Sequence, residues 1–255
     1  MLEFIKKIAE EAGEICLRES AGLSGTDPDF KGARDLVTVV DRMVEDHIIN
    51  EITTHFPEHN IIGEETGTTD HGADYCWIID PIDGTTSYFH QQPFYSVSIA
   101  YQVKGATQAG VVYAPALRQM FSAERDGGAW LNGTTRLTVS PTEIMINAVL
   151  ATGFACLRAG REPNNLYFLN RVLPQIRDIR RCGSAAIDLA YVAAGKVDGF
   201  WEMNLNIYDI AAGVLLVEEA GGVVSDMKGG DDFPQSGIVA SNGRITEHLL
   251  ECLNG

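Results

Sequence analysis

The chain has 255 residues, of which 45% are hydrophobic and 21% are charged, a composition typical of a globular protein that buries a continuous core. The balance of 19 Lys and Arg against 35 Asp and Glu gives a net charge of −16. A field of that sign repels phosphodiester backbones and anionic lipid surfaces. Disorder is therefore excluded as the main feature, and nucleic acid is not expected to be a partner.

The chain contains no apolar run near the ~20 residues that span a bilayer, so we expect no contact with a membrane. Its five cysteines are odd in number and form no CxxC pair, which argues against both a disulfide framework and a zinc cluster. A reducing cytoplasm is the location that this pattern favours.

The first half of the chain begins with helical patterns. Apolar residues recur with helical spacing over residues 1–20 and again over residues 41–56, before Pro57, which predicts two amphipathic helices. Between them, residues 21–34 are rich in turn formers and predict a long loop. From residue 60 to residue 149 the pattern changes to short apolar runs that predict strands, with a hairpin turn at residues 126–128.

The second half alternates helical and extended patterns, which implies layered sheets covered by helices. No Pro- or Ser-rich linker divides the sequence, so we expect one domain over residues 1–255, with two tightly packed lobes that meet near residue 151. The predicted helices span residues 164–173, 184–194, 207–220 and 244–253, and the predicted strands span residues 176–181, 199–202, 222–225 and 237–240.

The stretch WIIDPIDGTT over residues 77–86 is the most informative. A short buried strand leads into Asp80, and Pro81, which lacks a backbone N–H, is expected to end that strand. Asp80 and Asp83 can then converge beside the free backbone amides of residues 84–86. Two carboxylates next to N–H donors suit a hard cation and an anion together. The alternative is that both acids only cap turn amides.

Further acids occupy similar places in the first half. Glu64 and Glu65 follow the apolar residues 61–63 directly, and Asp41 lies near the end of the run LVTVV. Several carboxylates gathered at strand ends repel one another unless cations neutralise them. The pattern therefore favours a cation site over a set of unrelated turn caps.

Five stretches of the sequence together resemble the inositol monophosphatase family of lithium-sensitive, magnesium-dependent phosphatases. They are DLVTVVD over residues 35–41, GEET over residues 63–66, WIIDPIDGTT over residues 77–86, RCGSAAIDLAYVAAGKVDGFWE over residues 181–202 and YDIAAGVLLVEEAGG over residues 208–222. Their order and spacing also agree with the family. The resemblance implies an α/β fold, a layered αβαβα sandwich, and a homodimer.

The resemblance further implies a site for two to three Mg²⁺ ions. Glu64, Asp80 and the carbonyl of Ile82 would hold the first ion, and Asp80, Asp83 and Asp209 the second. A third ion would bind more weakly, through Glu64 and water. Oxygen ligands of this kind are what Mg²⁺ prefers. From the residues alone, Asp209 is equally suited to capping the helix that follows it.

The same resemblance implies catalytic roles for Glu64, Thr85 and Asp41, which would orient and deprotonate an attacking water. The backbone amides of Gly84, Thr85 and possibly Thr86 would hold the phosphate. From the residues alone, the Thr85 hydroxyl also fits a turn, and Asp41 also fits a helix N-cap.

Contacts to the rest of the substrate follow from the resemblance in the same way. Glu202 would accept hydrogen bonds from polyol hydroxyls, although it also fits a solvated charge at a strand end. Lys31 in the long loop would approach the phosphate, although a loop lysine is commonly just solvated. The full set of implied substrate-binding residues is Asp83, Gly84, Thr85, Gly183, Ser184, Ala185, Glu202 and Asp209.

Three positions depart from the family pattern. Ser87 stands where Asn is frequent, Tyr208 replaces a Trp, and Arg158 follows a GFAC sequence where many relatives have GFP. The arginine near the mouth of the site could favour a substrate with a second phosphate. The expected function is Mg²⁺-dependent hydrolysis of myo-inositol monophosphate to inositol and phosphate, by direct attack of water.

Two alternatives remain open at this point. A phosphatase of the same kind could act on fructose 1,6-bisphosphate, a nucleotide 3′-phosphate or histidinol phosphate, because the acidic motifs bind the phosphoryl group and not the alcohol. The fold could also serve as a binding or regulatory protein without turnover.

Overall fold

A computed structural model describes residues 1–20, 29–30, 36–37, 39–162 and 164–255 of the chain. Most of the loop expected over residues 21–34, including Lys31, lies outside the described residues. The short strands β1 (Asp29–Phe30) and β2 (Leu36–Val37) pair antiparallel within this region.

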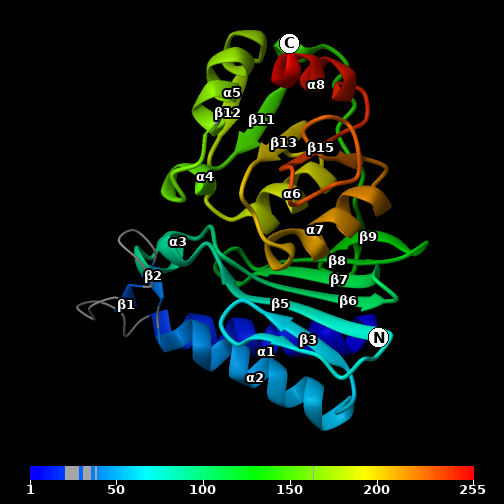
Figure 1. Cartoon of the computed structure of the whole chain (residues 1–255). Coiled ribbons are helices and arrows are strands. Elements are labelled where there is room, and N and C mark those ends of the chain that lie inside the picture. Colours follow the sequence, from blue (N-terminus) through cyan, green and yellow to red (C-terminus); the bar gives the residue numbers. More distant parts are fainter. Residues whose placement is uncertain (21–28, 31–35, 38, 163) are drawn as a thin grey trace.

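The outermost layer of the N-terminal half consists of α1 (Leu2–Ser20) and α2 (Val39–His55). The apolar stripe of α1, with Ile5, Ile8 and Ala12, is buried together with Ile48 and Ile52 of α2 against the larger sheet. Both helices were predicted from this periodicity, and Figure 1 shows them along one face of that sheet.

The larger sheet has eight strands among the described residues, in the order β10-β9-β8-β7-β6-β5-β3-β4. Only β3 and β5 pair in parallel, and every other neighbouring pair in this sheet is antiparallel. The strands are β3 (Asn60–Gly63), β4 (Gly67–Thr69), β5 (Tyr75–Asp83), β6 (Ser96–Val103), β7 (Ala106–Ala114), β8 (Gln119–Glu124), β9 (Gly128–Leu131) and β10 (Thr135–Arg136).

Two central helices, α6 (Ala185–Ala193) and α7 (Ile207–Glu219), lie between this sheet and a second one, as Figure 1 shows. They are apolar on nearly all sides, as expected of helices that are covered on both faces, and their core includes Phe200 of the second sheet and Val112 of the first. A Cβ on Gly213 would come within 2.6 Å of Leu189, so the two helices pack closely there.

The second sheet has the order β12-β11-β13-β15-β14 among the described residues. Its strands are β11 (Val149–Thr152), β12 (Asp178–Arg180), β13 (Gly199–Glu202), β14 (Val223–Ser225) and β15 (Ile238–Ser241). The helices α5 (Asn165–Val172) and α8 (Thr246–Asn254) cover its outer face (Figure 1). The layers therefore follow the predicted αβαβα order, and the fold class is confirmed.

The short helices α3 (Thr85–Phe89) and α4 (Ala155–Arg158) follow β5 and β11. No described helix has the length and apolar character that crossing a membrane requires. The division into one domain with two lobes meeting near residue 151 stays a prediction.

The prediction that Pro81 ends its strand is wrong. Strand β5 continues to Asp83, and its pairing with β6 shifts register between Asp80 and Asp83. The extra residues form an irregularity in which Pro81 needs no ladder hydrogen bond, after which Asp83 pairs with Ser96. Such irregularities are common where a strand aims side chains at a site.

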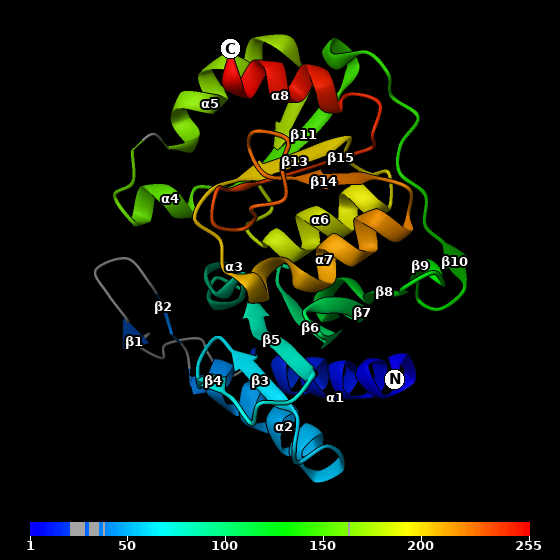
Figure 2. The same cartoon turned by 45° about the vertical axis from the view of Figure 1, so that its right-hand side comes forward.

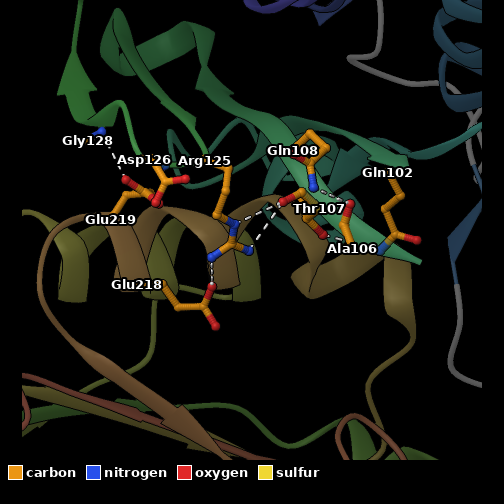
Figure 3. Close-up of polar contacts among 9 residues, drawn as sticks. All are labelled: Gln102, Ala106, Thr107, Gln108, Arg125, Asp126, Gly128, Glu218 and Glu219. Carbon is orange, nitrogen blue, oxygen red and sulfur yellow. Dashed lines mark hydrogen bonds and ion pairs between the residues drawn. The ribbon is translucent and has the colours of Figure 1, made fainter. Parts of the chain in front are cut away.

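The C-terminal end of α7 is attached to the turn between β8 and β9, as Figure 3 shows. Glu219 accepts hydrogen bonds from the backbone N–H of Asp126 (3.0 Å) and of Gly128 (2.9 Å). Arg125 donates to Glu218 at 2.7 Å and also to the carbonyl of Thr107. These contacts fix the position of α7 against the larger sheet.

Candidate active site

A cleft of about 560 Å³ lies where the end of β5 meets the beginnings of α6 and α7. Its lining brings together segments that are far apart in the sequence, and among the lining residues that the structure describes none is a histidine. Among the expected site residues that the structure describes, all except Asp41 line the cleft: Glu64, Asp80, Ile82, Asp83, Gly84, Thr85, Gly183, Ser184, Ala185, Glu202 and Asp209.

Three carboxylates form the centre of this cleft. Oxygens of Asp80, Asp83 and Asp209 all lie within 4.8 Å of one another. Asp80 and Asp83 come from the irregular end of β5, whereas Asp209 lies in the first turn of α7. Figure 2 shows the β5 arrow ending beside α3 and the start of α7. Asp209 also accepts the backbone N–H of Asn206, so it caps its helix and faces the other acids at once.

These acids repel one another, and burial disfavours their ionised forms. Burial raises the pKa of Asp80 well above its usual value, and the charges of Glu64, Asp83, Asp209 and Asp41 raise it further. Burial and then Asp83 raise the pKa of Asp209. Among the described residues no group donates a hydrogen bond to Oδ1 of Asp80. A buried, unpaired carboxylate in such a cluster fits a divalent cation, which would supply the missing positive charge.

Asp83 is stabilised by the beginning of α6. One of its oxygens accepts hydrogen bonds from the Ser184 hydroxyl at 2.6 Å and from the Ala186 N–H at 2.7 Å. Burial raises the pKa of Asp83 to about 6, and these hydrogen bonds together with Arg181 oppose the rise. The other oxygen of Asp83 is left for a ligand in the cleft.

Glu64 and Ile82 also line the cleft. Glu64 is half-buried and follows β3 directly, and its N–H donates to the carbonyl of Ile79 at 3.2 Å. The Thr85 hydroxyl donates to the carbonyl of Ile82 at 3.2 Å, which leaves one lone pair of that oxygen for a cation.

Asp41 lies in the first turn of α2 and does not follow a strand, which corrects the expectation that it sits at a strand exit. The helix begins at Val39, so Asp41 is also not its N-cap. It is buried and does not line the cleft, although its charge raises the pKa of Asp80. One turn later, Glu45 is buried on the same helix and accepts the N–H groups of Glu65 and Thr66 at 3.0 and 2.7 Å.

The beginnings of α3 and α6 approach each other closely at the cleft. Gly84 has a φ of +96°, and a Cβ on it would lie 2.8 Å from the carbonyl of Phe94 and 3.1 Å from that of Gly183. Only glycine fits this position without strain. Ser184 is the N-cap of α6 and accepts the N–H of Ile187 at 3.1 Å. At the start of α6 the N–H groups of Ala186 and Ile187 already donate to Asp83 and Ser184, so the start of α3 is where backbone N–H groups can face an anion.

Glu202 lies at the end of β13 and lines the same cleft, and its carboxylate accepts the N–H of Ala155 at 3.1 Å. Burial raises the pKa of Glu202 to about 7, and the contact with Ala155 opposes this rise. A Cβ on Gly153 would overlap the Glu202 carboxylate, so this glycine makes room for it. The Glu202 carboxylate is therefore fixed by a backbone hydrogen bond and is not a solvated charge.

Charged residues to which the sequence assigned no role also line the cleft. They are Arg42, Arg181 and Asp188, and they lie there together with Glu65 and Arg158, which were singled out. Asp188 lies one turn into α6, and burial raises its pKa well above the usual value. The one available signal for Asp188 and Glu45 was an acid within an apolar helical stripe. Arg181 gave no periodic signal, because its place in the cleft depends on the fold of other segments.

Known proteins resemble this chain over nearly its whole length. The model of the inositol monophosphatase family matches residues 1–254. An inositol-1-monophosphatase of Mesorhizobium japonicum is 40% identical over 99% of this chain and 96% of its own length. A protein of Salmonella typhimurium named Nus factor SuhB is 42% identical over 98% of this chain and 94% of its own. The crystal structure of the extragenic suppressor protein SuhB of Bartonella henselae matches with a TM-score of 0.93, 39% identity, and coverage of 99% and 97%.

Proposed function

Because this chain belongs to the inositol monophosphatase family, a family that is generally metal dependent, we propose that it is a Mg²⁺-dependent phosphomonoesterase that hydrolyses myo-inositol monophosphate to inositol and phosphate. The observation that carries this proposal is the cluster of Asp80, Asp83 and Asp209, whose carboxylates repel one another and form no ion pair with any described residue.

The residues that would hold two to three Mg²⁺ ions are Glu64, Asp80, the carbonyl of Ile82, Asp83 and Asp209. When bound there, Mg²⁺ would lower the pKa of water and stabilise the negative charge that develops on the leaving oxygen. The carboxylates would determine where the cations bind. Glu45 supports Glu64 indirectly, because it accepts hydrogen bonds from the turn that follows Glu64. Lithium is expected to inhibit the enzyme.

The protein's own groups position the other reactants. Glu64, Thr85 and Asp41 would orient the attacking water and accept its proton, with Asp41 acting through neighbouring groups because it does not line the cleft. The backbone N–H groups of Gly84 and Thr85 would hold the phosphate, since donors that are already oriented cost no rearrangement during the reaction.

The alcohol of the substrate would lie toward α6 and β13. Glu202, held by Ala155, would accept hydrogen bonds from its hydroxyls, and Gly183, Ser184 and Ala185 would form the adjoining wall. Asp83 and Asp209 would face both the cations and the substrate. Substrate class then depends on this wall, whereas the acidic cluster serves any phosphomonoester.

The experiment that tests the proposal is phosphate release from myo-inositol 1-phosphate, fructose 1,6-bisphosphate, a nucleotide 3′-phosphate and histidinol phosphate, with Mg²⁺ and with EDTA. We expect myo-inositol 1-phosphate to be hydrolysed with Mg²⁺ and not with EDTA. The variant Asp83→Asn is expected to fold and to lose more than about 100-fold in kcat, because one cation ligand becomes neutral. Wild-type activity in this variant would refute the ligand assignment.

A second candidate function is a binding role that does not need turnover, which the name Nus factor carried by several relatives favours. The catalytically impaired Asp83→Asn variant separates the two, because a binding role would survive in it. The homodimer, the cytoplasmic location and the exclusion of membrane and nucleic acid as partners stay predictions.

A further inference from the structure

One wall of the cleft contains a residue in the left-handed backbone conformation. In the described part of the chain, the residues other than glycine with a positive φ are Gln91, Lys104, Arg118, Asp126, Asn132 and Asn204. Of these, only Asn204, with a φ of +64°, lines the cleft. Glycine adopts this conformation most easily, and asparagine tolerates it better than most other residues. A side chain kept at such a position in a cleft is a candidate for a role in binding.

The chain around Asn204 alternates between the cleft and the core. Glu202 and Asn204 both line the cleft, whereas Met203 between them packs against the core beneath α5 and α8. Asn206 then forms the N-cap of α7. Asn204 therefore lies in the same wall as Glu202, between the end of β13 and the beginning of α7.

The side chain of Asn204 does not hold the fold together, as a comparison with Asn132 shows. Asn132 also has a positive φ, of +51°. Its amide accepts the N–H of Met120 at 2.8 Å and donates to the carbonyl of Arg118 at 3.2 Å, so it stabilises the turn. The Asn204 amide makes no hydrogen bond with any residue that the structure describes. Its donors and its acceptor are therefore available to a ligand in the cleft.

The Asn204 amide supplies hydrogen-bond donors that Glu202 lacks. An ionised carboxylate only accepts hydrogen bonds, whereas an amide has two N–H donors as well as an acceptor oxygen. A hydroxyl both donates and accepts, so a polyol that donates to Glu202 has further oxygens that need a donor. Arg158 and Arg181 also line the cleft, but guanidinium groups are better matched to anions than to neutral hydroxyls.

We propose that Asn204 determines specificity for the alcohol of the substrate, by donating a hydrogen bond to a hydroxyl beside the one that donates to Glu202. The inference rests on the proposed phosphatase function and adds to it a residue that selects the alcohol. A phosphate ester whose alcohol has no free hydroxyl gains nothing from this contact. Asn204 therefore acts on the choice of alcohol and not on the hydrolysis of the phosphate ester.

The activity test compares Asn204→Gly with the matched control Asn132→Gly, because glycine keeps the left-handed backbone at both positions. The substrates are myo-inositol 1-phosphate and phenyl phosphate, both with Mg²⁺, and thermal unfolding is measured for each variant. For Asn204→Gly we expect kcat/KM on the inositol ester to fall about 3- to 10-fold, mainly through KM, as for the loss of one neutral hydrogen bond. Its kcat/KM on phenyl phosphate should change less than about 2-fold, and its unfolding midpoint should not fall.

The control variant should show the opposite pattern. Asn132→Gly loses two hydrogen bonds of the turn, so its unfolding midpoint should fall, while the ratio of its activities on the two esters stays at the wild-type value. Equal losses of Asn204→Gly on both esters, or no loss on the inositol ester, would overturn the inference.

A binding measurement separates this inference from the proposed function. The phosphonate analogue of myo-inositol 1-phosphate and methylphosphonate, neither of which can be hydrolysed as an ester, are titrated calorimetrically into the protein with Mg²⁺. We expect the inositol phosphonate to bind more tightly than methylphosphonate, and Asn204→Gly to reduce the ratio of the two affinities about 3- to 10-fold. Absence of turnover on every ester would defeat the proposed function alone, whereas an unchanged affinity ratio in Asn204→Gly would defeat the role of Asn204.

Discussion

The two ends of α7 both carry acidic side chains, and their surroundings are opposite. At the first turn, Asp209 is within 4.8 Å of two other carboxylates, and its pKa is raised by burial. At the last turn, Glu219 accepts two backbone N–H groups and Glu218 pairs with Arg125 (Figure 3). A helix dipole favours acids at its beginning and disfavours them at its end.

This contrast separates acids that stabilise the fold from acids that destabilise it. The glutamates occupy the unfavourable end of the dipole, yet their hydrogen bonds attach α7 to a turn of the larger sheet. Asp209 occupies the favourable end, yet its ionised form is disfavoured in the folded protein. A carboxyl group whose pKa is raised by burial and by neighbouring acids in a cleft is the pattern expected of a binding site.

The largest expected effect is that of Asp209→Asn. Turnover should fall by more than about 100-fold, because a cation ligand becomes neutral. In EDTA at pH 8 the midpoint of thermal unfolding should rise by roughly 2–4 °C, the change expected for ~1 kcal/mol in a chain of this length. Asn can still accept the N–H of Asn206, so the cap is kept. A lowered midpoint would show that the charge of Asp209 stabilises the fold.

Glu219→Gln should have the opposite pattern. Gln has one acceptor oxygen, so its amide would face the N–H of Asp126 or Gly128, and a lost hydrogen bond of this kind costs ~1–3 kcal/mol. We expect a lower unfolding midpoint with kcat unchanged at temperatures well below it. Glu218→Gln is the matched control, because Glu218 forms an exposed ion pair with Arg125. Its free energy of unfolding should fall by less than about 1 kcal/mol. If both variants lose equal stability, Glu219 has no special role in the attachment.

The smallest expected effect is on the pH dependence of the unfolding midpoint, which should differ between EDTA and Mg²⁺. Burial raises the pKa of Asp83 from 3.8 to about 6 and that of Glu202 from 4.5 to about 7. The folded state therefore holds these protons more tightly than the unfolded state, and stability is lost as pH rises through this range. In EDTA the unfolding midpoint should fall as the pH rises from about 4 to about 7.

With Mg²⁺ the same pH series should flatten or rise, because carboxylates bind the ion only when ionised. Glu202→Gln should reduce the slope in EDTA without removing it. Identical slopes with and without Mg²⁺ would mean that no ion binds at the buried acids.

The sequence was sufficient to predict the elements whose periodicity is strong. Helices α1, α2 and α7 and strands β6 and β7 have uniform apolar patterns, and tertiary packing did not override them. Pro81 was misread because a missing N–H ends a regular ladder but is tolerated at an irregularity. Asp41 was expected at the end of a strand because LVTVV has the pattern of a single apolar run. In the structure the first two residues of this run belong to β2 and the last two belong to α2.

The acidic cluster could be anticipated because its residues lie in recognisable motifs, whereas its supporting groups could not. Glu45, Asp188 and Arg181 reach the cleft or its turns through contacts between segments that are distant in sequence. Local patterns hold no information on such contacts. Lys31 lies outside the described residues, so its expected approach to the phosphate stays a prediction.

The order of the chain has a consequence for how the protein is made. Asp80 and Asp83 emerge from the ribosome well before Asp209, and the layer that holds α7 in place includes strands on both sides of it in sequence. No nascent chain that ends before Asp209 contains the whole cluster. Magnesium uptake would thus be a late event of maturation, and a useful reporter that both halves of the nascent polypeptide have docked.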